Sequence, residues 1–242
     1  MYQTRKLALA PGHKMAEVIL NNPYLLLLLE HFGISVPLKD KTIEQICRQY
    51  NINIELFLTF ASLYNGVVYE PKTAFNFADS LTIISYLKNN HSYYQEEIYP
   101  AILATIRQMA GLNESGENGL VEQFFVEYFN EVREHLEYEN EVVFPYVISL
   151  SGKIGTATTS NIQAHYSVGE YKEHHNDIQE KLNDLKNLLI KYLPRQNDLP
   201  LRRKLLFMLS ELEYDLDIHS RIEDRILIPL VAKMETHLKT TE

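Results

Sequence analysis

The sequence has few of the features that mark secreted, membrane-spanning or disulfide-stabilised proteins. Its only cysteine is Cys47, which excludes an intramolecular disulfide and favours a reducing compartment. The longest apolar run, from Tyr24 to Leu29, is far too short to cross a bilayer. The segment from Met1 to Lys14 lacks the apolar core of a secretory signal. We therefore predict a cytoplasmic protein with no membrane partner.

Positive charge is also scarce. The formal net charge is −9, and no run of basic residues offsets it. Such a chain is poorly suited to a nucleic-acid groove or an anionic membrane surface, because both attract basic proteins. With 242 residues, 45% of them hydrophobic, the chain can bury one large core or two smaller ones.

What the sequence does have is helical periodicity, and it predicts an all-α protein. Apolar residues recur at steps of three and four, and signals for strands are scarce. The segment 1–70 is predicted to be a small helical domain and 71–79 a linker. Residues 80–242 are predicted to form an up-down-up-down four-helix bundle, because four long helices joined by short turns pack as antiparallel neighbours. The predicted helices span 14–21, 22–32, 42–50, 53–65, 80–111, 118–150, 158–193 and 198–237.

The pattern His-x-x-x-Glu occurs once in the second long helix, 118–150, and once in the fourth, 198–237. A spacing of four places both side chains on one helix face, about one turn apart. In each copy a proline, Pro145 or Pro229, follows ten residues after the histidine, which suggests an internal duplication. The two pairs are His135 with Glu139 and His219 with Glu223.

Each long helix carries an apolar stripe that is interrupted by a histidine. The interruptions in the first and third helices are His91 and His175, and we prefer His175 to His174, which lies about 100° further round the helix. In an antiparallel bundle all four histidines and both glutamates lie at similar depth. The remaining histidines have no such support and receive no metal role: His13, His31, His165 and His237.

A metal centre explains why an apolar core would contain these groups. A buried carboxylate is costly unless it is paired or bound to metal, and two divalent or trivalent ions would accept both imidazole and carboxylate ligands. For a single His-x-x-x-Glu motif, the alternative to metal binding is an ion pair on the protein surface. Manganese and zinc accept similar ligands, so the sequence leaves the metal open. The predicted ligands are His91, His135, Glu139, His175, His219 and Glu223.

At these residues the chain resembles the hemerythrin-like (HHE) domains, and within them the di-iron RIC proteins, the repair-of-iron-centres family. The stretches 81–91, 135–145, 173–175 and 219–229 resemble the four ligand helices of that family. The resemblance implies an oxo- or hydroxo-bridged centre of two iron ions, with the four histidines as terminal ligands and both glutamates as bridges.

The first 70 residues also resemble the short N-terminal domain of these proteins, but the Cys-Cys motif is missing. The family motif would follow Gly33-Ile34, where this chain has Ser35-Val36-Pro37. A step that depends on a thiol therefore cannot run through that position. Cys47 is expected to be a helix core residue, with a reactive thiol as the alternative.

The resemblance implies a role in the repair of iron–sulfur clusters damaged by oxidative or nitrosative stress. Iron donation or the handling of nitric oxide at an open di-iron site would serve that role, with damaged iron–sulfur proteins as partners. The alternative is a module that binds or senses dioxygen, nitric oxide, peroxide or iron without catalysis, and a metal-stabilised scaffold is a third reading. Whether the chain is an enzyme, and whether it forms a homodimer, stay open.

Overall fold

Two of the short N-terminal helices begin or end at residues that commonly cap helices. Thr42 and Gln45 form a reciprocal capping box at the start of α3 (Ile43–Tyr50). Gly66 ends α4 (Ile54–Asn65) in the left-handed conformation, which glycine adopts without steric cost. Local sequence thus sets these boundaries within about a residue of those predicted from the sequence.

This computed structural model describes residues 8–112, 117–156, 167, 169, 179–192 and 198–241. Within these ranges the chain is all-helical, as predicted, and its one isolated β-bridge joins Lys14 to Thr42. No helix in the described ranges is both long enough and apolar enough to cross a membrane.

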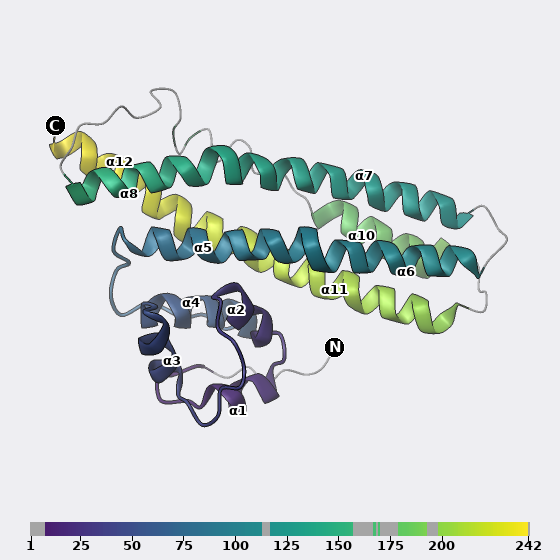
Figure 1. Ribbon diagram of the computed structural model, residues 1–242, viewed down its shortest axis with the longest axis horizontal. Coiled ribbons are helices and arrows are strands. Elements are labelled where there is room, and N and C mark those ends of the chain that lie inside the picture. Colours follow the sequence, from purple (N-terminus) through teal and green to yellow (C-terminus); the bar gives the residue numbers. More distant parts are fainter. Residues whose placement is uncertain are drawn as a thin grey trace. The chain divides into compact units, whose positions relative to one another are not determined.

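The remaining elements follow in chain order (Figure 1). The other α-helices are α1 (Met15–Asn21), α2 (Leu25–His31), α5 (Asp79–Ser92), α6 (Tyr99–Gly111), α7 (Glu117–Tyr138), α8 (Phe144–Thr156), α10 (Gln179–Asn187), α11 (Leu199–Ile222) and α12 (Ile228–Thr241). Among the described residues, four π-helical segments interrupt or end the long helices: η1 (Tyr93–Ile98), η2 (Glu139–Val143), η3 (Leu188–Tyr192) and η4 (Glu223–Leu227).

By the density of internal contacts, the chain divides into two compact units. Unit 1 comprises Met1–Asn89, Tyr146–His165 and Arg221–Glu242, and unit 2 comprises Asn90–Pro145 and Tyr166–Ser220. The first eleven residues of α5 thus belong with the N-terminal helices. The linker predicted at 71–79 stays a prediction.

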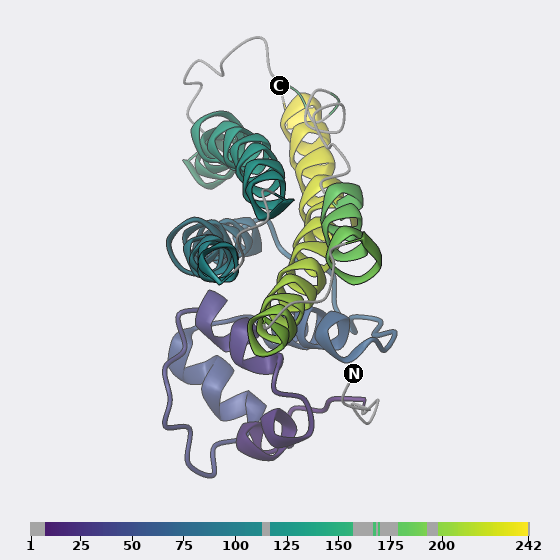
Figure 2. The same cartoon turned by 90° about the vertical axis from the view of Figure 1, so that its right-hand side faces the viewer.

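In unit 1, whose short helices are drawn as ribbons in Figure 2, aromatic rings from the end of α2, from α4 and from the start of α5 pack together. The ring of Tyr86 in α5 packs against those of Phe32 and Phe60, at centroid distances of 4.8 and 4.9 Å. Its hydroxyl lies 2.9 Å from that of Tyr64 in α4. Asn89 donates to the backbone carbonyl of His31 at 2.8 Å. These contacts attach α5 to the helices that precede it.

In unit 2 four helical segments contribute to one apolar core. Buried residues of η1 and α6, of α7, of α10 and η3, and of α11 form a single cluster, and α7 contacts both α6 and α10. The members most deeply buried in it include Tyr94, Ile102, Phe125, Val132, Leu182, Leu189, Leu205, Leu209 and Leu212.

The long helices of the described residues agree with the predicted periods, with one correction. The turn predicted after Leu150 is wrong, because α8 continues through Gly152 to Thr156. The chain is not in the left-handed region at Gly152, so the glycine costs helix stability only about 1 kcal/mol. Pro100 lies within the first predicted long helix, and the π-helical segment η1 precedes it. Most of the third predicted helix, including His175, lies outside the described residues.

Candidate metal centre

Three histidines from three helices surround one carboxylate in unit 2. Nε2 of His91, at the end of α5, lies 3.3 Å from Oε2 of Glu139. Nε2 of His135, one turn before the glutamate, lies 3.2 Å from Oε1. Nε2 of His219, in α11, lies 3.9 Å from Oε2. The side chains of Glu139, His91 and His219 are buried, whereas that of His135 is 14% exposed.

The ligand atoms converge on a common point. One ligand atom from each of His91, Glu139 and His219 lies within 4.8 Å of the other two, so this buried group can hold a metal ion. The imidazole rings of His91 and His219 have centroids 5.1 Å apart and an interplanar angle of 41°. Because His135 approaches the other carboxylate oxygen, Glu139 has imidazole nitrogens on both sides.

The environment of the Glu139 carboxylate favours an ion over a purely structural role. Neither of its oxygens accepts a hydrogen bond from any described residue, although imidazole nitrogens lie close to both. Burial by itself raises the pKa of this carboxyl, but His135, His219 and His91 hold the pKa well below its usual range. A buried carboxylate that stays ionised, with imidazole nitrogens beside both of its oxygens, is placed to bind a cation.

Asn140 orients one of the ligands. Its Oδ1 lies 3.2 Å from Nδ1 of His91. In the tautomer protonated on Nδ1, the imidazole donates to Asn140, and the lone pair of Nε2 is available on the side of Glu139. The ring of Phe144 stacks on the other side of His91 at 5.4 Å. A hydrogen bond from the second ring nitrogen is the usual way in which proteins orient a ligating histidine.

The local helix geometry at Glu139 is unusual. Glu139 is the first residue of η2, and Phe144 donates its backbone N–H to the carbonyl of Glu139, five residues earlier. Glu223 stands in the same position in η4, where Ile228 donates to it. π-Turns of this kind are rare in proteins, and those that occur are often found at functional sites.

The structure therefore brings together four of the six predicted ligands: His91, His135, Glu139 and His219. His175 lies outside the described residues. Glu223 belongs to unit 1, where its side chain is fully buried, and its role as a bridging ligand stays a prediction. The sequence did not predict a role for Asn140. The one feature that could have indicated it is its position directly after Glu139.

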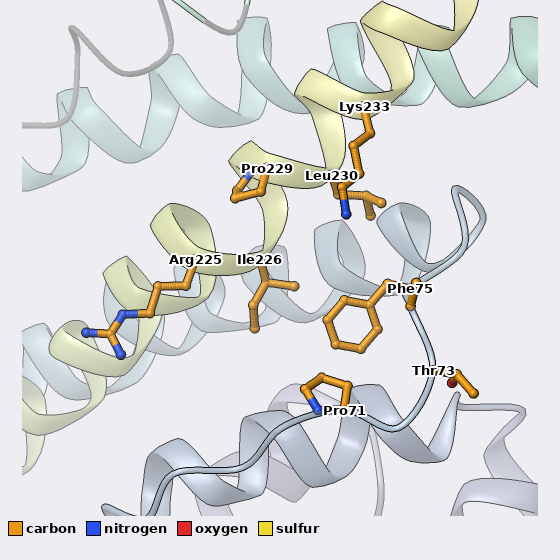
Figure 3. A pocket seen from close by; sticks show the side chains of 9 residues that line it. Pro71, Thr73, Phe75, Arg225, Ile226, Pro229, Leu230 and Lys233 are labelled. Atoms are coloured by element: carbon orange, nitrogen blue, oxygen red, sulfur yellow. The ribbon is translucent and has the colours of Figure 1, made fainter.

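A cavity of about 380 Å³ lies elsewhere, within unit 1 (Figure 3). The ring of Phe75 and the side chains of Ile226 and Leu230 line it, and its only ionisable groups belong to Arg225 and Lys233. Two cationic groups do not make a metal site, so this cavity does not compete with the histidine cluster for that role.

Comparisons with known proteins give no independent assignment: no model of a protein family matches the chain, and neither a curated protein nor a solved structure matches it.

Proposed function

We propose that this chain is a hemerythrin-like, non-haem di-iron protein. Residues 80–242 would form an up-down-up-down four-helix bundle, and residues 1–70 a small helical domain. The observation that carries the proposal is the convergence of His91, His135 and His219 on the Glu139 carboxylate within an apolar surrounding. The four helical segments that share the core of unit 2 support the bundle.

Two further ligands complete the proposed centre. His175 would supply an imidazole from the remaining long helix, so that each helix contributes one histidine. Glu223 follows His219 by four residues and begins a π-turn, as Glu139 does after His135. This repeated local geometry supports a second carboxylate bridge.

The donor set fits iron, since imidazole and carboxylate ligands both bind it well. Iron would supply redox chemistry and open positions for dioxygen, nitric oxide or peroxide. The protein's own contribution is to hold the ligands in an apolar core, to fix the tautomer of His91 through Asn140, and to keep Glu139 ionised. The exposed edge of His135 marks the side of the cluster nearest to solvent.

For the biological role we propose the repair of iron–sulfur clusters damaged by oxidative or nitrosative stress in the cytoplasm. The labile iron would be donated to a damaged cluster, or nitric oxide would be removed at the open positions. The alternative is a module that binds or senses dioxygen, nitric oxide or iron without catalysis. The missing Cys-Cys motif favours this alternative, because no thiol is available at that position for exchange with a partner.

Elemental analysis and Mössbauer spectroscopy on protein purified without oxygen test the metal centre. We expect two iron ions per chain with the signature of a coupled pair. Protein that contains no iron and takes up none when Fe²⁺ is added would overturn the proposal. A chain that binds zinc alone under the same conditions would retain the site but overturn the redox role.

Substitutions of two neighbouring histidines test the proposed third-helix ligand, which lies outside the described residues. We expect His175→Asn to lower the iron content, and His174→Asn to leave it unchanged. The two substitutions are matched in chemistry and differ by one position. The opposite result would assign the ligand to His174, and no effect of either would remove the third long helix from the centre.

Three assays separate the roles. Iron donation predicts that iron leaves the loaded protein for an apo-cluster acceptor, and complete retention of iron would contradict it. Removal of nitric oxide predicts many turnovers by the reduced protein, whereas a sensor binds one equivalent and stops. Loading with redox-silent zinc would abolish both activities but preserve the fold.

A further inference from the structure

Unit 2 contains a buried acid that the proposed ligand set does not use. Asp215 lies in α11, four residues before His219, and its side chain is fully buried. Oδ2 of Asp215 accepts a hydrogen bond from the Tyr94 hydroxyl at 2.8 Å and a longer one from Nδ2 of Asn90 at 3.4 Å. Both donors are themselves buried.

The two donors flank a ligand. Asn90 directly precedes His91 in α5, and Tyr94 follows it by three residues at the start of η1. One carboxylate oxygen therefore joins the helix that carries His91 to the helix that carries His219. The ring of Tyr94 also packs edge-on against the imidazole of His219, with centroids 5.9 Å apart.

We infer that Asp215 and Tyr94 are positioning residues for the metal centre, which set the separation of the His91 and His219 imidazoles. The inference rests on the proposed metal site. Two ligands from different helices bind an ion well only if the helices are held in register before the ion arrives, and outer partners of ligands commonly do this. A hydrogen bond of 2.8 Å inside an apolar core is directional and costly to break, so it suits this purpose.

The same unit provides matched comparisons. Tyr93 donates to Glu211 at 3.0 Å, one turn before Asp215 in α11, but this pair is only partly buried. Tyr99 is as deeply buried as Tyr94, and its hydroxyl donates to Tyr128 at 3.3 Å. Tyr99→Phe therefore removes a buried hydroxyl, as Tyr94→Phe does. The described ring and hydroxyl contacts of Tyr99 include no predicted ligand.

The test is a titration of the metal-free full chain with Co²⁺, followed by its visible absorption bands, which report coordination. We expect Tyr94→Phe and Asp215→Leu to weaken Co²⁺ binding about 10–100-fold and to change the spectrum. Asp215→Asn should recover most of the affinity, because its amide oxygen can still accept from Tyr94. Tyr99→Phe should lower thermal stability but leave the affinity and the spectrum unchanged.

Each outcome is decisive. If the unsubstituted chain binds neither Co²⁺ nor Fe²⁺, the proposed function fails and this inference fails with it. If the unsubstituted chain binds Co²⁺ and Tyr94→Phe behaves identically, positioning is wrong although the metal site stands. An equal loss in Asp215→Asn and Asp215→Leu would assign the effect to charge and overturn positioning, as would an equal loss in Tyr99→Phe. Should Asp215→Leu not fold, Tyr94→Phe, which keeps its ring, decides.

Discussion

Phe144 and Glu139 are joined by a backbone hydrogen bond that spans five residues, so the widest turn of this helix begins at a predicted ligand. A proline explains why the turn is wide. Pro145 follows Phe144, and its missing N–H and its ring are incompatible with a regular turn over the carbonyl four residues earlier. Pro100 and Pro229 stand at the same offset after η1 and η4, and Pro194 after η3. A proline thus follows each of the described π-helical segments at the same offset in the sequence.

Pro145→Ala should therefore raise the stability of the metal-free protein and weaken metal binding. Alanine restores an N–H that can donate to the carbonyl of Glu141, and helix interiors prefer alanine to proline by about 3 kcal/mol. The regular helix would turn Glu139 away from the histidines. Thermal unfolding and Co²⁺ titration check the two effects.

Pro194→Ala is the control for that substitution, because η3 contains no predicted ligand. It should leave Co²⁺ affinity unchanged. If Pro145→Ala bound Co²⁺ as tightly as the unsubstituted chain, the π-turn at Glu139 would have no part in placing the ligand.

Metal binding should be visible as stability. An ion that binds only the folded state stabilises it by about 2.7 kcal/mol at a hundred times its dissociation constant. We expect Fe²⁺ to raise the unfolding midpoint of the metal-free chain and a chelator to reverse the shift. Glu139→Gln should abolish the shift, because the amide lacks the charge and the second carboxylate oxygen.

Glu131→Gln is the comparison for Glu139→Gln. Glu131 lies two turns earlier in α7, is exposed, and pairs with Lys181. Its substitution should preserve the full metal-induced shift. A shift that survives in Glu139→Gln would place the ion elsewhere.

Asn140→Ala should lower metal affinity about tenfold without preventing folding, since it removes the acceptor that faces Nδ1 of His91. Nitrogen NMR of the imidazole provides the direct measurement, because it reports which ring nitrogen carries the proton. Glu141→Ala, on the exposed side of the same turn, should change neither quantity. An unaltered tautomer and affinity in Asn140→Ala would show that Phe144 alone orients the ring.

The helices and their order could be predicted because their signals are local. Apolar periods, caps such as Thr42, and glycines such as Gly66 act over a few residues each. The π-turns were not predicted, because one extra residue in a single turn hardly changes the spacing of apolar residues along a helix. The helix predicted to end at residue 150 continues through Gly152, and the predicted end was wrong because a glycine that a helix tolerates resembles, in sequence, one that ends it.

The ligands were predictable to the extent that their pattern lies within single helices. His135 with Glu139 is visible as a spacing of four, and His91 and His219 are visible as interruptions of apolar stripes. Asp215 is equally polar, but its partners Tyr94 and Asn90 lie more than a hundred residues away, so only the fold reveals the contact. The roles of His175 and Glu223 stay predictions.

Cys47 should be inert in the folded protein. It is buried in α3, as expected for a core residue, and burial raises the pKa of its thiol to about 12 from an ordinary value of 9.0. The reactive thiolate is then nearly absent near pH 8. We expect alkylation by iodoacetamide to be slow in the folded chain and fast in denaturant, and rapid labelling of folded protein would revive a thiol-based role.

The same shift predicts how stability depends on pH. Because the pKa of the Cys47 thiol is higher in the folded state, its contribution to stability is intact below about pH 9 and is lost as pH rises toward 12. The unfolded chain releases this proton first, which costs up to about 1.4 kcal/mol of stability per pH unit. Cys47→Ala should flatten that part of the unfolding profile, as measured by denaturant titration between pH 8 and 11. Identical slopes for the two proteins would mean that the thiol ionises as readily in the folded chain as in the unfolded one.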